Sequence, residues 1–593
     1  MSLNFENTNE IWAYVLTETL KRLGLNCVVI CPGSRSTPLT VAFAKPSLDI
    51  EAIPILDERS AAFFALGRAK ATGKPVALVC TSGTAGANFY PAVIEAKESR
   101  VPLLIFTADR PNELRDCHSG QTIDQLKLYG SYPNWQGELA TPGAEMEMLG
   151  YLRQVLVYAF ERSLYPVKGP VHLNVPLRDP LAPIDDGVDL SHLQQLNPED
   201  FFAHINDATS PNSLSSSTIP YSQLPFSQFQ RGIIIAGVSQ PKNPYIYSEA
   251  IGKLASYLGF PVLAEGLSPV RNYADLNPYI VSSYDLILRN QQFAEELVPE
   301  IVIQIGEMPT SKVLRTWLQK TQPIFFIIDP SDQNLDPLHG KTTHLRFSIE
   351  SLFTSSSNIS SSISPSTSVS TSPLTPYLQR WLKLEIGVRN QVDKKMEDMD
   401  LHFEGKAAWL LSQILPESTP FFIANSMPVR DVEFFWKPNT LRVRSHFNRG
   451  ANGIDGTLST ALGIAHRNQS SVMLTGDLAL LHDTNGFLIG KKFIGHLTIV
   501  LINNNGGGIF GMLPIAKFEP PFEEFFATPQ DIDFCQLCAT YSVEHELIKN
   551  WQQLEQRLNQ LPKTGIRVLE LQTNRQADAR WRQENLGKFT ITP

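Results

Sequence analysis

The chain has 593 residues, of which 42% are hydrophobic and 18% charged, and its formal net charge at pH 7 is −9. This length predicts about three or four domains, and the composition is that of an ordinary globular protein. The negative charge argues against nucleic-acid binding, and we expect no membrane span and no secretory signal. The six cysteines are scattered, as in a reducing compartment. We therefore expect a cytoplasmic protein.

Residues 1–185 alternate between helix and strand and are predicted to form the first domain. Apolar residues at helical spacing, preceded by Asn and Thr, predict a helix over 7–24. Short apolar runs follow at 26–33, 50–58, 75–86 and 101–111, each ending in turn residues. Such alternation predicts an α/β fold in which helices cover both faces of a parallel sheet. The polar turns then meet at the carboxyl edge of that sheet.

Glu58 stands at this edge, between the strand AIPIL and the helix ERSAAFFALGRAKA. One interpretation is structural, since a carboxylate in the first turn interacts favourably with the helix dipole. The other is catalytic: a carboxylate at the ligand-binding edge of the sheet could exchange a proton with a bound cofactor. The choice depends on whether the rest of the chain carries a site for such a cofactor.

Residues 195–350 repeat the strand–helix pattern and are predicted to form a middle domain. The runs RGIIIAGVS, FPVLAEG, EIVIQIGE and PIFFIID have the composition of buried strands. No G-x-G-x-x-G sequence is present, so a bound dinucleotide is not supported. The Ser-rich tract at 355–373 is predicted to be a flexible linker, and a Ser/Pro-rich stretch at 209–227 to separate the first two domains.

Residues 375–593 are predicted to form the last domain, around the segment from Gly476 to Phe510. Two β-rich runs, SVMLTGD and HLTIVLINNN, flank a helix-length segment and predict a βαβ unit whose strands end side by side. Asp477 and Asn504, which are 27 residues apart, would then share the edge where ligands bind. A carboxylate, an amide oxygen and a backbone carbonyl suit Mg²⁺, which completes its shell with water and phosphate oxygens. An aspartate ending a strand and an Asn-Gly turn would also explain the pattern.

Two further loops of the last domain also carry residues that could bind a ligand. Asn425 and Ser426 come directly after the apolar run FFIA, and the glycine-rich turn NRGANGIDG precedes a helix whose first amides could face an anion. Cys535 and Cys538 form a close pair without a second pair or a nearby histidine, which favours helix packing over zinc or redox chemistry.

Several blocks of sequence resemble one family. They are CPGSRSTPLT, LDERSAAFFALGRAKATGKPVALVCTSGTAGANFYPAVIEA, LIFTADRPNELRD, NRGANGIDG and NNNGGGIFGMLP. In this order they resemble the MenD family, the 2-succinyl-5-enolpyruvyl-6-hydroxy-3-cyclohexene-1-carboxylate synthases of menaquinone and phylloquinone biosynthesis, within the thiamine-diphosphate decarboxylase superfamily. The resemblance implies a three-domain α/β carboligase (a transferase), with a pyrimidine-binding, a middle and a diphosphate-binding domain. It also implies decarboxylation of 2-oxoglutarate and Stetter-like 1,4-addition of the succinyl-semialdehyde carbanion to isochorismate.

The resemblance implies the cofactor site residue by residue. Asp477, Asn504 and the carbonyl of Gly506 would hold Mg²⁺ (or Mn²⁺) and through it the diphosphate of thiamine diphosphate, while Glu58 would activate the pyrimidine. Ile454 would support the bent cofactor. Further contacts to the cofactor are expected from Ser426, Leu478 and Ile509.

Both substrates are dianions, which arginine binds well because its guanidinium clamps carboxylates bidentately. The resemblance implies a substrate site formed by Ser34, Arg35, Arg110, Gln121, Arg271, Asn425, Arg430, Arg449, Phe510 and Leu513. Each of these arginines could instead form a solvent-exposed or structural ion pair. Gly120 stands where some relatives carry Asn, and His118 and His482 are expected to have hydrogen-bonding or packing roles.

The resemblance further implies a homodimer or homotetramer with active sites at the subunit interface, where Glu58 of one chain meets Asp477 of another. Two alternatives stay open at this point. One is a carboligase acting on another 2-oxo acid, similar to acetolactate synthase, and the other is a non-catalytic protein that binds thiamine diphosphate.

Overall fold

The computed structural model describes residues 5–45, 48–191, 193, 197–208, 226, 228–352 and 374–589. The Ser-rich tract predicted at 355–373 lies outside these residues, as does the stretch 209–227 apart from residue 226. The described chain is built on three six-stranded sheets, and every strand pairing within them is parallel. The predicted α/β class with three mainly parallel sheets is therefore confirmed. We call the parts around these sheets the first (5–208), middle (226–352) and last (374–589) regions.

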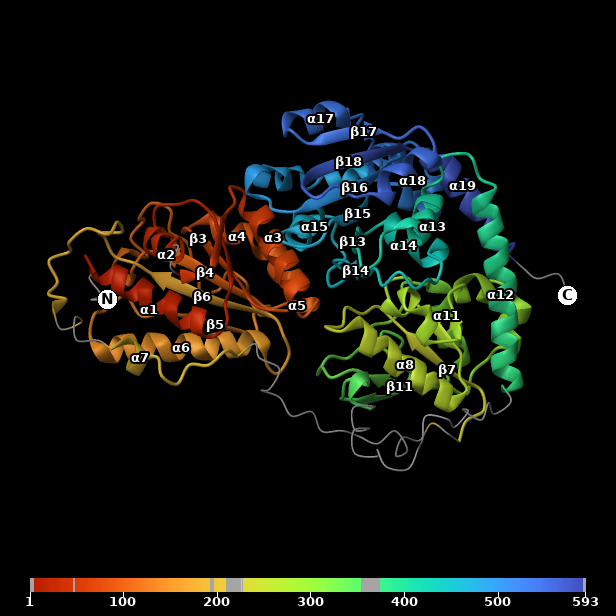
Figure 1. Ribbon diagram of the computed structural model, residues 1–593, viewed down its shortest axis with the longest axis horizontal. Helices are drawn as coiled ribbons and strands as arrows, with labels where there is room; N and C mark the ends of the chain where they lie inside the picture. Colours follow the sequence, from red (N-terminus) through yellow and green to blue (C-terminus); the bar gives the residue numbers. More distant parts are fainter. Residues whose placement is uncertain are drawn as a thin grey trace.

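The first sheet has the strand order β2-β1-β3-β4-β6-β5. Asn7 caps α1 as the sequence predicts, because its side chain accepts a hydrogen bond from the amide of Glu10. Helices lie on both faces of the sheet, with α6 and α7 below it in Figure 1. The elements are α1 (Thr8–Arg22), β1 (Cys27–Ile30), α2 (Thr37–Phe43), β2 (Glu51–Pro54), α3 (Glu58–Thr72), β3 (Val76–Cys80), α4 (Thr84–Asn88), α5 (Tyr90–Glu98), β4 (Leu103–Asp109), β5 (Trp135–Glu138), α6 (Met146–Leu164), β6 (Pro170–Pro176) and α7 (Pro198–Phe201).

The middle sheet has the order β12-β11-β10-β7-β8-β9. Its strands include the four predicted runs, and two further strands, β9 and β12, complete the sheet. The elements are β7 (Gly232–Ala236), α8 (Pro244–Leu258), β8 (Val262–Ala264), β9 (Ile280–Val281), α9 (Tyr284–Leu288), α10 (Gln291–Glu296), β10 (Ile301–Ile305), α11 (Lys312–Thr321), β11 (Ile324–Ile328) and β12 (Lys341–Leu345).

The last sheet has the order β14-β13-β15-β16-β18-β17. The predicted strands at its centre, β15 and β16, pair in parallel from Ser471↔Leu497 to Gly476↔Ile502. The elements are α12 (Pro376–Glu397), α13 (Glu404–Ile414), β13 (Pro420–Ile423), α14 (Met427–Phe435), β14 (Arg444–His446), α15 (Thr457–Ala465), β15 (Ser471–Gly476), α16 (Asp477–Leu481), η10 (Thr484–Lys492), β16 (His496–Asn503), α17 (Phe534–Thr540), β17 (Glu544–Leu547), α18 (Trp551–Asn559), β18 (Gly565–Gln572) and α19 (Arg575–Asn585).

Two details differ from the simplest expectation. The helix-length segment between β15 and β16 is not one helix: α16 ends early and a 3-10 segment follows, interrupted at Gly490, whose φ is 43°. Residues 197–208, which fall inside the predicted middle domain, pack on the first region, since Phe202 is buried in the core around α1. The other domain boundaries given in the sequence analysis remain predictions.

The last region packs against both others within one chain. Helix α12 runs along the middle and last regions in Figure 1, and its Trp381 is fully buried in a core shared by both. On the other side α15 crosses α3 of the first region, where a Cβ added to Gly67 would lie 2.1 Å from the carbonyl oxygen of Thr460. A Cβ added to Gly463 would lie equally close, at 2.1 Å, to the carbonyl oxygen of Phe64. The two helices therefore cross in backbone contact, which glycine alone permits.

Across the described residues, no helix combines the length and the apolar character needed to cross a membrane.

Candidate active site

A cavity of about 140 Å³ opens at the carboxyl edge of the last sheet, where β13, β15 and β16 end. This is the edge at which parallel α/β sheets bind their ligands. Its lining includes many of the residues predicted for the cofactor and substrates, namely Asn425, Ser426, Ile454, Asp477, Leu478, Asn504, Gly506, Ile509 and Phe510.

Asp477 is the buried carboxylate of this cavity. It is 4% exposed, and its Oδ2 accepts a hydrogen bond of 2.7 Å from the amide of Gly506. Burial raises the pKa of Asp477 to about 6, although backbone amides of Leu478 and Gly506 oppose the shift. The close turn at Gly506 requires glycine, because φ is +141° and an added Cβ would lie 2.4 Å from the carbonyl oxygen of Ala527. The strand-end aspartate and the Asn-Gly turn therefore meet as predicted.

The side chain of Asn504 gives the most direct indication of a metal-binding site. Its Nδ2 donates a hydrogen bond of 2.5 Å to Oε1 of Glu404. Its Oδ1 is buried and has no hydrogen-bond partner among the described residues. A buried carbonyl oxygen without a partner is costly, and a cation beside it would satisfy it. The donor set, a carboxylate and an amide oxygen, fits a hard divalent ion. No described group of three or more His, Cys, Asp and Glu side chains could cage a metal by itself.

A buried charge network lies behind Asn504. The Arg582 guanidinium donates to Glu404 at 2.9 Å and to Asp431 at 2.6 Å. Asp578 accepts a hydrogen bond of 3.3 Å from the backbone amide of Glu404. Burial raises the pKa of both Asp431 and Asp578, while the Arg582 charge lowers it. The network has more carboxylates than cations, which favours a bound cation at the cavity.

Glu404 was missed by the sequence analysis. It is 2% exposed and begins the apolar helix α13, EGKAAWLLSQI. A carboxylate is seldom fully buried unless it has a partner, so its place at the start of this apolar segment was the available signal.

The predicted polar residues of the last region form one connected group beside the cavity. Arg449 donates to Oδ1 of Asn425 at 3.0 Å, and Arg430 donates to the carbonyl of Ser426 at 2.6 Å. Burial, followed by the charge of Arg449, lowers the pKa of Arg430. Ser426 itself has φ +74°, a strained conformation that is common at functional sites. Two half-buried guanidiniums so close together favour an anion between them.

A second polar group lies at the edge of the first sheet. Arg110 donates to the hydroxyl of Ser82 and, at 3.0 Å, to the carbonyl of Gln121. Gln121 donates to the carbonyl of Ser82 at 2.8 Å. Burial and then the charge of Arg35 lower the pKa of Arg110, so these two guanidiniums also lie close to each other. Ser34 is exposed on the neighbouring loop. The structure thus brings together Ser34, Arg35, Arg110 and Gln121.

Glu58 is the first residue of α3, where Asp57 caps the helix. It lies near Cys80 at the end of β3, since burial and then the Glu58 charge raise the pKa of that thiol. In the described part of the chain its carboxylate makes no hydrogen bond or ion pair. The lining of the cavity at the last sheet contains no described residue of the first region. The two halves predicted for the site therefore lie on separate edges of one chain.

Arg271 behaves differently from the other predicted arginines. Its side chain is 0% exposed and is 3.3 Å from Glu433. Its guanidinium also donates to the carbonyls of Ala264, Glu433 and Ser282, each at 2.8 Å. These contacts favour a structural role over substrate contact.

The remaining predicted positions are at the surface or in the core. Leu513 is 36% exposed near the cavity, and His118 and His482 are exposed. An added Cβ at Gly120 would meet nothing within 4 Å, so the position has room for the Asn of some relatives. Cys538 is buried in the core shared by the first and last regions, which agrees with the packing role expected for it, whereas Cys535 is exposed.

Comparison with known proteins agrees with this fold. Residues 12–128 match the family model "Thiamine pyrophosphate enzyme, N-terminal TPP binding domain", and residues 206–423 match "Middle domain of thiamine pyrophosphate". A solved structure of a thiamine diphosphate-dependent 4-hydroxybenzoylformate decarboxylase from Rhodococcus jostii covers 95% of this chain and 99% of its own, with a TM-score of 0.65. At 15% identity this likeness shows the fold alone.

Two curated relatives extend over the whole chain. The 2-succinyl-5-enolpyruvyl-6-hydroxy-3-cyclohexene-1-carboxylate synthase of Trichormus variabilis is 68% identical over 590 residues, covering 99% of both chains. The protein of the same name from Gloeothece citriformis is 63% identical over 597 residues, covering 100% of both. The chain therefore belongs to the 2-succinyl-5-enolpyruvyl-6-hydroxy-3-cyclohexene-1-carboxylate synthase family of thiamine-diphosphate enzymes.

Proposed function

We propose that this protein condenses 2-oxoglutarate with isochorismate, releasing CO₂ and forming 2-succinyl-5-enolpyruvyl-6-hydroxy-3-cyclohexene-1-carboxylate for menaquinone or phylloquinone biosynthesis. The observation that carries this proposal is the unpartnered oxygen of Asn504 beside Asp477, in a chain that matches synthases of this name along its entire length. We also infer that the protein works in the cytoplasm, which cell fractionation would test.

The cavity at the last sheet would hold the diphosphate end of thiamine diphosphate through Mg²⁺ or Mn²⁺. Asp477, Asn504 and the carbonyl of Gly506 would supply the protein ligands, and phosphate and water oxygens the others. Ile454, Leu478 and Ile509 line the same cavity and would contact the rings of the cofactor from its apolar side, with Ser426 at its edge. When bound, thiamine diphosphate supplies the electron sink that allows a 2-oxo acid to lose CO₂.

Glu58 would hold a proton in a hydrogen bond to the aminopyrimidine ring of the cofactor. Its unengaged carboxylate at a helix start suits this role, because a group already hydrogen-bonded within the protein would not be available. The proton on this carboxylate would favour the ring tautomer that acts as the base.

Two arginine groups would bind the carboxylates of the substrates. Arg430 and Arg449 lie beside the cavity, with Asn425 and Ser426 as their partners, while Ser34, Arg35, Arg110 and Gln121 lie on the first region. Each pair of close, half-buried guanidiniums would be stabilised by a dianion between them. Phe510 and Leu513 would form the apolar wall and exclude water.

The active site would be complete only in a homodimer or higher oligomer. The first-region residues are absent from the lining of the last-region cavity in the described chain, and Leu56, 64% exposed next to Glu58, is available for contact with another subunit. We infer that Glu58 of one subunit faces Asp477 of the other.

The test follows the ultraviolet absorbance of isochorismate with purified protein, 2-oxoglutarate, Mg²⁺ and thiamine diphosphate, leaving out each component in turn. The proposal requires loss of absorbance and CO₂ release that depend on all of them. CO₂ release from 2-oxoglutarate without isochorismate consumption would contradict the assigned acceptor. Turnover of pyruvate instead would point to a carboligase similar to acetolactate synthase, and no turnover of any 2-oxo acid to a non-catalytic protein.

A further inference from the structure

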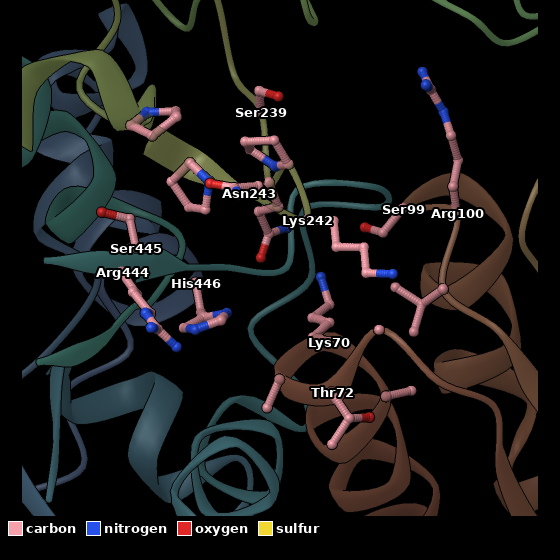
Figure 2. Close-up of a pocket in the computed structure, with 18 of the residues that line it drawn as sticks. Lys70, Thr72, Ser99, Arg100, Ser239, Lys242, Asn243, Arg444, Ser445 and His446 are labelled. Atoms are coloured by element: carbon pink, nitrogen blue, oxygen red, sulfur yellow. The ribbon is translucent and has the colours of Figure 1, made fainter. Parts of the chain in front are cut away.

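A second and larger cavity, of about 470 Å³, lies where the three regions meet. Its walls come from the end of α3 and the loop after α5 in the first region, from the loop after β7 in the middle region, and from β14 in the last region. Figure 2 shows Lys70 reaching from α3 into the space between the loop carrying Lys242 and the strand carrying Arg444 and His446. The volume falls in the range of about 300–1,000 Å³ that small-molecule sites occupy.

The lining of this cavity is strongly basic. It contains Lys70, Arg100, Lys168, Lys242 and Arg444 together with His446, and no Asp or Glu. This is a local excess of positive charge in a chain whose net charge is −9. Cations gathered around a partly enclosed space sum their potentials and concentrate anions there.

Only part of this charge is balanced by the protein. Arg100 forms an ion pair of 2.9 Å with Asp329, and Lys70 is 3.7 Å from Glu95. Lys168, Lys242 and Arg444 form no ion pair with any residue in the described part of the chain. The cluster therefore holds three cations whose counter-charge would have to come from solvent or from a ligand.

Burial, with neighbouring cations at two positions, disfavours the charged forms of Lys70, Lys168 and His446. The Lys70 side chain is 3% exposed, and burial lowers its pKa although Glu95 and Glu307 oppose the shift. Burial and then Lys242 lower the pKa of Lys168. The pKa of His446 falls to about 3 through burial and the charges of Lys70 and Arg444. An anion in the cavity would favour the charged forms of all three groups.

The rest of the lining suits an organic anion. Hydroxyl groups of Ser239 and Ser445 can donate hydrogen bonds to phosphoryl or carboxylate oxygens, whereas those of Thr72 and Ser99 already donate to the carbonyl of Arg68 and the carboxylate of Glu95. Leu267, Pro269 and Tyr273 give the cavity an apolar side. Polar groups of this number with an apolar wall are typical of a ligand pocket.

We propose that this cavity binds a small anion carrying at least two negative charges on phosphoryl or carboxylate groups. The bound anion contacts all three regions of the chain and holds them together. The proposal rests on the geometry and charge of this cavity alone and goes beyond the carboligase function.

The experiment uses the full chain saturated with thiamine diphosphate and Mg²⁺, so that the diphosphate site is already filled. Inorganic phosphate and succinate are titrated separately by calorimetry, and thermal unfolding is followed against sodium chloride of equal ionic strength. We expect saturable binding of at least one anion and a raised Tm. Tighter binding of phosphate assigns phosphoryl chemistry to the site, and tighter binding of succinate assigns carboxylate chemistry.

Charge-reversal variants locate the binding. Lys242→Glu and Arg444→Glu, both at exposed positions, are expected to weaken it at least about tenfold. Lys383→Glu makes the same charge change on the exposed surface of α12 and is expected to leave it unchanged. Unaltered thiamine diphosphate affinity in each variant shows that the fold is kept. Absence of saturable binding of both anions, or equal binding by all three variants, would overturn the proposal, whatever the outcome of the turnover assay.

Discussion

Glu404 accepts a hydrogen bond of 2.5 Å from the side-chain amide of Asn504 and so turns the amide oxygen of Asn504 away from itself, where it has no partner among the described residues. The two residues are 100 positions apart in the chain. Groups behind a metal ligand commonly set its orientation in this way.

We therefore predict that Glu404→Gln weakens the Mg²⁺-dependent binding of thiamine diphosphate by about 10–100-fold. A glutamine amide could accept or donate, so Asn504 would no longer be held with its oxygen toward the metal. The measurement is calorimetric titration of cofactor at several Mg²⁺ concentrations. Glu397→Gln, an exposed position at the end of α12, is the matched control, and equal affinities of the two variants would contradict the orienting role.

Glu58→Gln is predicted to lower turnover by about 10²–10⁴-fold while leaving cofactor affinity nearly unchanged. The substitution keeps the size of the side chain but removes the group that would share a proton with the pyrimidine ring. Single-turnover assays and cofactor titrations measure the two effects separately. Glu147→Gln makes the same change in the first turn of α6 and should keep full activity. Wild-type activity in Glu58→Gln would refute the proton-holding role.

Arg271→Met is predicted to destabilise the fold by about 3–5 kcal/mol, the usual cost of removing one partner of a buried ion pair. Glu433 would be left buried without its guanidinium. Thermal unfolding measures the loss, and Arg380→Met, which breaks the exposed pair with Glu296, should change stability by at most about 1 kcal/mol. The protein that stays folded should keep its KM for both substrates. A raised KM at wild-type stability would restore Arg271 as a substrate ligand.

Glu51 is predicted to make stability depend on acid pH. Burial alone would raise its pKa, but hydrogen bonds from His466 and Arg467 of the last region lower it to about 2. Because the folded-state pKa lies below the ordinary glutamate value of 4.5, this stabilisation is fully present above pH 4.5 and is lost as the pH falls toward 2. Discounted for solvent screening, it amounts to about 1–2 kcal/mol. Glu51→Gln should therefore lower Tm at pH 7, lower it less at pH 3 and have little effect near pH 2; a constant difference across this range would exclude the ion pair as the cause.

Gly463→Ala is predicted to destabilise the protein by about 1–3 kcal/mol, because the added methyl group would press on the backbone of Phe64, which cannot rotate away. Gly150→Ala is the control: it lies in α6 with nothing within 4 Å of an added Cβ, and should stabilise the helix by about 0.5–1 kcal/mol. Denaturant unfolding compares the two, and similar effects would show that α3 and α15 can separate.

Much of the fold could be predicted because short stretches of sequence indicate its strands and helices. The runs around Asp477 and Asn504 have the length and β-branched content of buried parallel strands, and β15 and β16 lie side by side with both residues at one edge. Residues 197–208 gave no such signal, since their attachment to α1 depends on the burial of Phe202 against distant residues.

The positions of the candidate site residues could be predicted where these residues lie in turns after strands, and the residues that contact them from distant parts of the sequence could not. Glu404 and Arg582 meet across 178 positions, and no spacing in the sequence indicates that contact. Arg271 lies in a short loop, and a loop of few residues does not reveal that its arginine is enclosed by backbone carbonyls. Charge alone therefore could not separate substrate arginines from structural ones.

The backbone contact between α3 and α15 has a consequence for how substrates enter. Since Gly67 and Gly463 leave no space between these helices, the first and last regions of one chain form a rigid block that cannot hinge open at this crossing. Entry and exit must then depend on movements outside the block. The segment after the Asn-Gly turn leaves Phe518 59% and Phe525 69% exposed, and its Phe526 packs against Phe510 of the cavity wall with ring centroids 5.8 Å apart. Opening of this segment, rather than rotation of a domain, would limit the rate of product release.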